Sequence, residues 1–311
     1  MRWPISPRPN KRSAVDLLSI DSLSDDQIAA ILDEGDRWVE ANRSRAEADM
    51  SLSGQIVFNL FYENSTRTLM SFAVAAHRLG AQVVTLPVEH SSVRKGETLE
   101  DTARTLNAMR PDALIIRHFE NGAPARMTEI MDCPVVNAGD GTNEHPTQAL
   151  LDALTIRRHF GRLAGLTVAI CGDIKHSRVA RSNAKLLPRL GAEIRLAGPP
   201  ALLPGDLHGS GDIDAAIDGA DVVMMLRVQR ERLEEDLNDA PGEYLARYGL
   251  TPERLLRAAP NAVVMHPGPM NRGVEIDGAL ADDPERSLIP LQVEAGVAVR
   301  MACLRLLVES A

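Results

Sequence analysis

The chain has 311 residues, about twice the length of a common single domain, so two α/β-sized domains are expected. Its net charge of −9 and sequence pI of about 5.4 argue against a general binder of nucleic acids or anionic membranes. The N-terminal residues show no signal-peptide pattern, and no apolar run approaches the roughly 18 residues of a membrane span. Cys133, Cys171 and Cys303 have no metal-ligand spacing and fit a reducing compartment. We therefore expect a soluble cytoplasmic protein without a metal site.

Helical and strand patterns alternate through the first half of the chain. A capping box of Ser24 and Gln27 opens the first helix, and apolar residues then recur at helical spacing from position 28 to 39. Short apolar, often β-branched runs predict strands at residues 56–61, 82–86, 113–116 and 134–136. Amphipathic stretches predict helices at residues 66–79, 98–109, 124–131 and 146–159.

The same alternation restarts after a turn at residues 161–165. Strands are predicted at residues 167–171, 193–197, 221–226 and 262–265, and helices at residues 177–190, 252–258 and 293–308. Buried strands alternating with helices predict an α/β fold, with two open parallel-sheet domains and the active site in the cleft between them. Periodicity alone leaves open which domain the last helix covers.

Basic and hydroxyl side chains follow nearly every predicted strand. In the first half they lie at residues 65–68, 91–98, 117–118 and 145–148; in the second half at residues 175–178, 227–229 and 266–269. Ligands of open parallel sheets bind outside the carboxyl ends of the strands. An acidic protein that concentrates cations at these ends is therefore expected to bind a multiply charged anion between its two domains.

The segment Ser65-Thr66-Arg67-Thr68 is the sharpest of these signals, because it lies where a strand turns into a helix. The free N–H groups of a helix N-terminus, three hydroxyls and a guanidinium together suit a phosphoryl group. Taken alone, the segment also fits an ordinary helix cap with a surface arginine. The chain has no P-loop, and the turn that begins at Gly172 lacks the glycines of a dinucleotide fingerprint. These absences favour a small phosphorylated molecule over ATP or NAD.

Six segments, taken together and in this order, resemble the aspartate/ornithine carbamoyltransferase family. They are Ser65-Thr66-Arg67-Thr68, the loop at residues 91–98, Arg117-His118, His145-Pro146-Thr147-Gln148, Arg227-Val228-Gln229 and His266-Pro267-Gly268-Pro269. The resemblance implies transfer of a carbamoyl group from carbamoyl phosphate to an amine, with no cofactor. It also implies a homotrimer with shared active sites. Residues 1–148 plus 291–311 would form the carbamoyl-phosphate domain, and residues 149–290 the aspartate domain.

The resemblance also implies a role for each matching residue. Ser65, Thr66, Arg67 and Thr68 match the phosphate ligands of the family. Thr68, Arg117 and His145 match the groups around the carbamoyl oxygen, and Gln148 matches the contact to the amide nitrogen.

Ser91 and Lys95 match residues lent by an adjacent subunit, and Ser92 is the alternative if the loop is shifted by one position. Arg178, Arg227 and Gln229 match the aspartate ligands, and the carbonyls of Pro267 and Gly268 would face the reacting amine or amide. The catalytic set is thus Arg67, Thr68, Lys95, Arg117 and His145, with His145 favoured as a hydrogen-bond donor rather than a general base.

The acceptor amine is predicted from charge. Ornithine-specific relatives commonly carry a His-Cys-Leu-Pro segment, whereas this chain has His266-Pro267-Gly268-Pro269 and supplies Arg227. L-Aspartate is therefore favoured, which gives N-carbamoyl-L-aspartate and phosphate in pyrimidine biosynthesis. Transfer to ornithine or another amine is the alternative, as is an inactive anion-binding scaffold. The sequence leaves open whether regulatory chains or a dihydroorotase-like partner attach.

Overall fold

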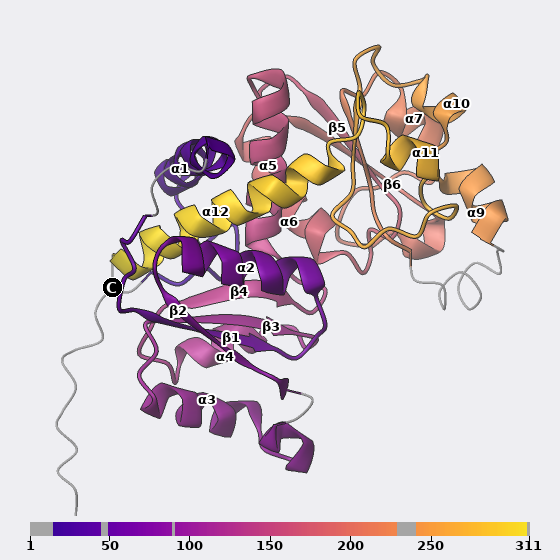
Figure 1. Ribbon diagram of the computed structural model, residues 1–311. Helices are drawn as coiled ribbons and strands as arrows, with labels where there is room; N and C mark the ends of the chain where they lie inside the picture. Colours follow the sequence, from indigo (N-terminus) through magenta and orange to yellow (C-terminus); the bar gives the residue numbers. More distant parts are fainter. Residues whose placement is uncertain (1–14, 45–48, 89–90, 229–240, 310–311) are drawn as a thin grey trace, which may run out of the picture.

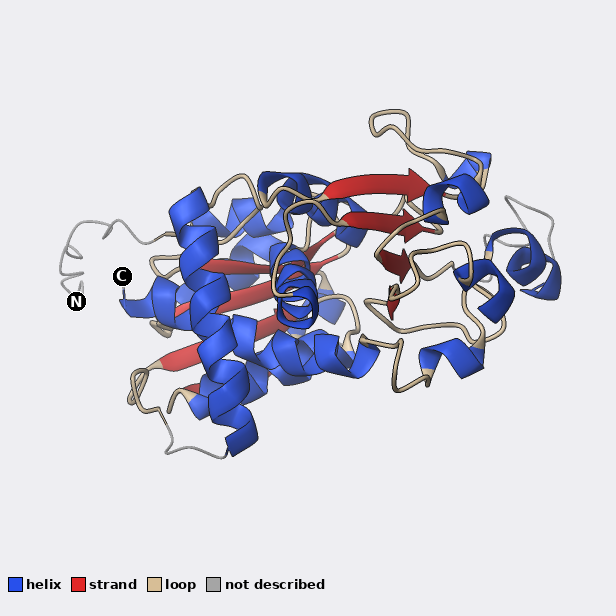
Figure 2. Cartoon of the chain, turned by 90° about the horizontal axis from the view of Figure 1, so that it is seen from above, coloured by secondary structure: helices blue, strands red, loops and turns tan. Residues whose placement is uncertain are grey.

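The computed structural model describes residues 15–44, 49–88, 91–228 and 241–309. Two four-stranded sheets, both entirely parallel, form the centre of the molecule, with strand orders β2-β1-β3-β4 and β6-β5-β7-β8. Helices flank both sheets (Figures 1 and 2). The predicted α/β class with two open parallel sheets is confirmed.

The first sheet is built as the hydrophobic pattern predicts. Its strands are β1 (Ile56–Phe61), β2 (Gln82–Leu86), β3 (Ala113–His118) and β4 (Val135–Asp140). The accompanying helices are α1 (Asp25–Ser44), α2 (Thr66–Arg78), the short 3₁₀ helix η2 (Ser92–Lys95), α3 (Leu99–Ala108) and α4 (Ala123–Thr128). The capping box is present: the Gln27 amide donates to Ser24 Oγ at 3.2 Å, and the Ser24 amide donates to Gln27 Oε1 at 2.9 Å.

The second sheet follows a linking helix, α5 (Pro146–Phe160). Its strands are β5 (Thr167–Cys171), β6 (Glu193–Ala197), β7 (Val222–Met225) and β8 (Val263–Met265). The remaining helices are α6 (Arg178–Arg189), η3 (Pro200–Leu202), α7 (Ile213–Ile217), α9 (Pro241–Tyr248), α10 (Pro252–Leu255), α11 (Gly278–Ala281) and α12 (Ile289–Glu309).

Two strands run further than their apolar patterns indicate. β3 continues through Arg117 and His118, and β4 continues to Asp140. The backbone ladder sustains this extension, because Arg117 pairs with Phe61 of β1 and His118 pairs with Asp140. Backbone hydrogen bonds do not depend on side-chain polarity, so a strand can extend past its last apolar residue. Arg117 is consequently held by the sheet rather than by a loop.

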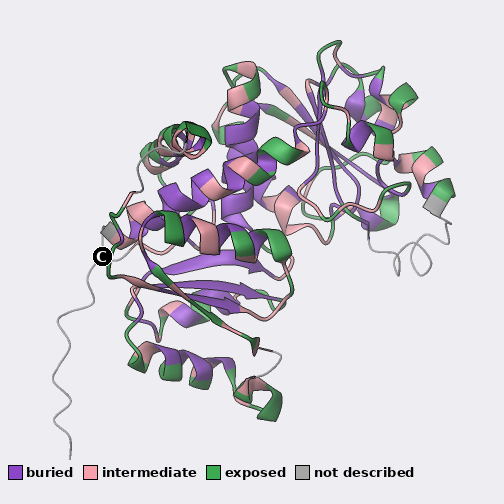
Figure 3. Ribbon diagram, in the orientation of Figure 1, coloured by how far each residue is buried: buried purple, intermediate pink, exposed green. Residues whose placement is uncertain are grey.

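The last helix, α12, crosses the molecule and packs against α1, α2 and α5 (Figure 1). One continuous apolar core joins these helices to the inner faces of both sheets, whereas two further clusters cover the opposite sheet faces. Figure 3 shows most strands buried and the outer helix faces exposed, whereas the edge strand β2 is largely exposed. Among the helices of the described residues, none has the length and apolar character needed to span a membrane.

Candidate active site

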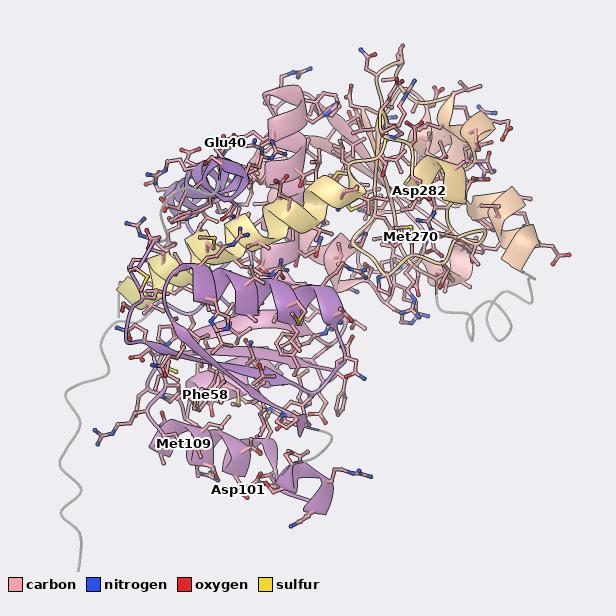
Figure 4. All side chains as sticks on the ribbon, viewed as in Figure 1. Glu40, Phe58, Asp101, Met109, Met270 and Asp282 are labelled. Carbon is pink, nitrogen blue, oxygen red and sulfur yellow. The ribbon has the colours of Figure 1, made fainter. Side chains whose placement is uncertain are left out.

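The carboxyl ends of both sheets open onto one cavity of about 390 Å³. Its wall comes from the segments after β1, β4, β5, β7 and β8 and from the end of β3. Met270, labelled in Figure 4, lies on the wall segment that follows β8. The predicted site residues that line this cavity are Ser65, Thr66, Arg67, Thr68, Arg117, His145, Gln148, Arg178, Arg227, Pro267 and Gly268. The fold therefore gathers side chains from distant positions in the sequence around a single hollow.

The N-terminus of α2 forms one wall of the cavity. Ser65 caps this helix, and its Oγ accepts the Thr68 backbone N–H at 3.4 Å. The positive end of the helix dipole and the Arg67 guanidinium give this wall a strong affinity for anions. Burial lowers the pKa of Arg67, because a partly desolvated guanidinium loses some of the stabilisation that water gives its charged form. This arrangement can hold a phosphate.

Three donors lie together beside that helix end. Thr68 Oγ1 is 3.5 Å from His145 Nε2, and Arg117 lies on the same cavity wall. His145 is buried, and its pKa is held well below the usual value, first by burial and then by the charge of Arg117. The imidazole is therefore neutral at pH 7 and a weak base, so it is suited to donate a hydrogen bond to a carbonyl oxygen.

A glutamate bridges two of the cavity arginines. Glu63 Oε1 lies 2.5 Å from a guanidinium nitrogen of Arg117 and 2.5 Å from one of Arg178. Burial alone would raise the pKa of Glu63, but the hydrogen bond from Arg178 and the charges of both arginines outweigh it and lower that pKa. Gly139 makes room for this cluster, since a Cβ there would lie 2.9 Å from Arg117 and 3.2 Å from Arg178. The bridge links the edges of the two sheets.

The segment after β8 closes over Arg67. Gly268 has φ of +65°, and a Cβ at that position would lie 2.4 Å from the Arg67 guanidinium carbon. A leucine here would need both a different backbone and a displaced arginine. The structure thus explains the glycine: the Arg67 side chain occupies the space that a side chain at position 268 would fill.

Two predicted residues lie elsewhere, and a third is not among the described residues. Ser91 caps the start of the η2 turn and Lys95 is its last residue, and neither lines the cavity of its own chain. The Ser91 hydroxyl donates to the Val88 carbonyl at 2.8 Å, whereas Ser92 pairs with Glu97 at 2.5 Å. Gln229 lies outside the described residues.

Several residues of the cavity wall were missed by sequence reasoning. They are Glu63, Gln292, Arg300 and His266. Glu63 lies shortly before the Ser65–Thr68 segment, and its position after β1 could have indicated that it reaches the same cavity. Arg300 is a buried charge on helix α12, where it lies 5.0 Å from the centre of the Phe72 ring and donates to the Gly296 carbonyl at 3.0 Å. Its neighbours at helical spacing in the sequence are apolar, and a charge on such a face is costly to bury, which is a signal that the sequence offered.

Two family models match the chain consecutively. The model of the aspartate/ornithine carbamoyltransferase carbamoyl-P binding domain matches residues 15–158, and the model of the Asp/Orn binding domain matches residues 164–307. The chain belongs to the aspartate/ornithine carbamoyltransferase family. It is therefore a carbamoyltransferase.

Individual relatives of this carbamoyltransferase agree. The aspartate carbamoyltransferase catalytic subunit of Rhizorhabdus wittichii is 59% identical, with 94% of both chains covered. Among solved structures, aspartate transcarbamoylase from Trypanosoma cruzi with carbamoyl phosphate and aspartate has a TM-score of 0.84 and 33% identity, covering 96% of this chain and 98% of that one. Ornithine carbamoyltransferase from Thermus thermophilus has a TM-score of 0.82 and 27% identity, covering 94% and 98%. Because both branches share the fold so closely, the acceptor must be argued from the side chains.

Proposed function

We propose that this chain is an aspartate carbamoyltransferase, which converts carbamoyl phosphate and L-aspartate into N-carbamoyl-L-aspartate and phosphate, a step of pyrimidine biosynthesis. The observation that carries the proposal is the charge of the cavity. Among the described residues, five arginines line it against one carboxylate, Glu63. Two substrates with several negative charges suit such a wall, whereas the cationic side chain of ornithine does not. Relatives that are named for this activity support it.

Carbamoyl phosphate occupies the wall formed by the α2 N-terminus. Its phosphate accepts hydrogen bonds from Ser65, Thr66 and Arg67. Its carbonyl oxygen lies against the Thr68, Arg117 and His145 donors, and its amide nitrogen faces Gln148. Donors placed where an oxyanion develops are worth about 2.7–4 kcal/mol each in the transition state.

Aspartate occupies the other side of the cavity. Arg178 and Arg227 bind its two carboxylates, together with Gln229, and the Pro267 and Gly268 carbonyls face the amine. The neutral amine attacks the carbonyl carbon, the bond from that carbon to the phosphate oxygen breaks, and the amine proton passes to the departing phosphate. Holding both reactants in this geometry supplies about 7–11 kcal/mol of the barrier.

The complete site requires a neighbouring copy. Lys95 is exposed, Ser91 is half-buried, and both lie away from the cavity of their own chain, as residues offered to an adjacent subunit do. A homotrimer with shared sites is accordingly part of the proposal. So is the division into residues 1–148 plus 291–311 and residues 149–290, which the packing of α12 on α1 and α2 supports. A cytoplasmic location stays a prediction.

One assay tests the proposal directly. The purified chain is incubated with carbamoyl phosphate and either L-aspartate or L-ornithine, and carbamoylated product and phosphate are measured. We expect equal amounts of N-carbamoyl-L-aspartate and phosphate, and no citrulline. Product from ornithine alone would establish the alternative acceptor, and binding without any product would establish an inactive scaffold. Mixing Lys95→Ala and Arg67→Ala chains, each of low activity, tests the trimer, because activity above that of either variant requires sites built from two subunits.

A further inference from the structure

A buried carboxylate lies directly behind the cavity and has no place in the mechanism above. Asp152, on α5, is fully shielded from solvent. Its Oδ1 accepts the side-chain amides of Gln148 at 3.0 Å and Gln292 at 2.8 Å, and its Oδ2 accepts that of Asn183 at 2.9 Å. The three donors come from α5, α12 and α6, so Asp152 is where these helices meet.

The charge of Asp152 decides how the two glutamine amides are turned. Burial raises the pKa of Asp152 to about 6, which still leaves the carboxylate ionised at pH 7. An ionised carboxylate only accepts hydrogen bonds, so each amide must turn its NH₂ group toward it. One N–H of Gln148 is thereby used by Asp152, and the amide turned in this way has its carbonyl oxygen free to serve as an acceptor for a ligand in the cavity that Gln148 lines. The NH₂ of a carbamoyl group needs such an acceptor.

The second glutamine continues the hydrogen-bond chain toward the other side of the cavity. With its NH₂ on Asp152, Gln292 uses Oε1 to accept the backbone N–H of His266 at 2.9 Å. The His266 ring in turn accepts the Gly268 backbone N–H on Nδ1 at 2.8 Å, and its Nε2 lies 3.2 Å from the buried Glu275 carboxylate. The backbone that carries the Pro267 and Gly268 carbonyls is thus held at two points, the His266 N–H by Gln292 and the Gly268 N–H by the His266 ring.

We propose that Asp152 is a positioning residue that serves both substrates: it turns the Gln148 carbonyl toward the carbamoyl NH₂ and, through Gln292, fixes the His266–Gly268 backbone beside the acceptor amine. This inference rests on the proposed function. It differs from a purely structural role, in which Asp152 holds α5, α6 and α12 together and affects both substrate contacts only through overall stability.

Inorganic phosphate and carbamoyl phosphate separate the two roles. Both use the α2 N-terminus, but only carbamoyl phosphate needs Gln148. For Asp152→Leu, which keeps the size and removes both acceptor oxygens, we expect the dissociation constant of carbamoyl phosphate to rise about tenfold and that of inorganic phosphate to stay within about twofold. Both are measured by calorimetry, and the KM for aspartate is expected to rise as well.

Two further variants sharpen the measurement. Asp152→Asn is expected to restore most of the carbamoyl-phosphate affinity, because its amide oxygen can serve both glutamines while its NH₂ faces Asn183, whose own carbonyl oxygen is buried without a partner. The matched control is Asn183→Leu, which removes the third contact of Asp152 on the side away from the cavity. It is expected to lower the melting temperature and to leave both dissociation constants unchanged.

Gln292→Met tests the contact between Gln292 and the His266 backbone without changing the buried Asp152 carboxylate. This variant also decides between a positioning and a purely structural role if Asp152→Leu does not fold. We expect its KM for aspartate to rise about tenfold, with carbamoyl-phosphate affinity within about twofold of the unmodified chain. Equal losses for phosphate and carbamoyl phosphate in Asp152→Leu, or an unchanged aspartate KM in Gln292→Met, would overturn the inference. An unmodified chain that forms no carbamoyl-aspartate contradicts instead the proposed function.

Discussion

The two sides of the cavity are built from different kinds of groups. On the side of the first sheet, Thr68, Arg117 and His145 are buried and fixed by a helix start, a strand and a second helix start. On the side of the second sheet, Arg227 is exposed, whereas Arg178 is held by the same Glu63 carboxylate that pairs with Arg117. The first side therefore offers buried donors that the fold already holds in place, whereas the second adds an exposed cation, Arg227, that a ligand must still position.

This difference predicts two kinds of mutational effect. Groups that are buried and preorganised act most strongly where charge develops in the transition state, so their loss should lower kcat. Exposed cations interact with substrate and transition state alike, so their loss should mainly raise KM. The variants below test whether the two sides of the cavity differ in this way.

Arg117→Ala is expected to have the largest effect. It removes a buried donor from the carbonyl oxygen, so kcat should fall by about 10²–10³-fold. Steady-state kinetics at saturating aspartate and carbamoyl phosphate measure this. Calorimetric binding of inorganic phosphate is the control, since the α2 N-terminus is untouched. A kcat within about threefold of the unmodified value would remove Arg117 from the catalytic groups.

Asp152→Asn is expected to change the pH dependence of stability. The folded protein holds the Asp152 proton up to about pH 6, whereas the unfolded chain releases it near the ordinary value of 3.8. The stabilisation by this proton is thus full below about pH 4 and lost as pH rises to 6. The asparagine does not titrate, so the variant should gain about 3 kcal/mol relative to the unmodified chain over that window.

Denaturant unfolding at several pH values between 4 and 7 measures the Asp152→Asn effect. Asp206→Asn is the matched control, because Asp206 is exposed and its pKa is lowered by Arg181 rather than raised. Parallel stability curves for Asp152→Asn and the unmodified chain would mean that the carboxylate is solvated.

Arg67→Ala is expected to lower kcat/KM for carbamoyl phosphate by about 10–100-fold, since a hydrogen bond to a charged group contributes about 1.5–3 kcal/mol. The variant also opens the space beside Gly268. Arg78→Ala, an exposed position at the far end of the same helix, provides the comparison. Turnover within about threefold would contradict the phosphate-binding role of the α2 N-terminus.

Arg227→Ala belongs to the exposed side. The KM for aspartate should rise about tenfold with a smaller change in kcat, because solvent weakens the lost contact. Carbamoyl-phosphate affinity should be unchanged. A fall in kcat as large as that of Arg117→Ala would show that the two sides of the cavity do not differ in the way described.

Gly268→Ala should have the smallest effect. The methyl group must displace the flexible end of Arg67, and a side chain at φ of +65° costs about 1 kcal/mol. We expect a lower melting temperature and a several-fold weaker affinity for carbamoyl phosphate. In the Arg67→Ala background, Gly268→Ala should no longer change the affinity for carbamoyl phosphate, because the side chain that the methyl group displaces is absent. The loss of stability should remain, because it comes from the backbone conformation.

The sequence predicted the fold and most of the cavity wall because both depend on local patterns. Strand–helix alternation indicated the two sheets, and the residues after the strands of each sheet meet at its carboxyl end. Arg67 from the first sheet and Arg227 from the second therefore line one cavity, because the carboxyl ends of the two sheets open onto it. What escaped prediction depends on contacts between distant segments. Nothing in the pattern around Glu63 indicates that it pairs with Arg178, and Asp152 and Gln292 meet only because α12 returns across the molecule. The roles assigned to these residues remain proposals.

The path of α12 has a consequence for how the protein is made. The apolar faces of α1 and α2 are synthesised early, yet the helix that covers them is synthesised after both sheets. Until α12 has been synthesised, the nascent chain exposes surfaces of the kind that favour aggregation. Because α12 also carries Ile289, Gln292, Val293 and Arg300 into the cavity wall, the pocket lacks these four residues until α12 docks. A prematurely terminated chain would therefore lose solubility and substrate binding together.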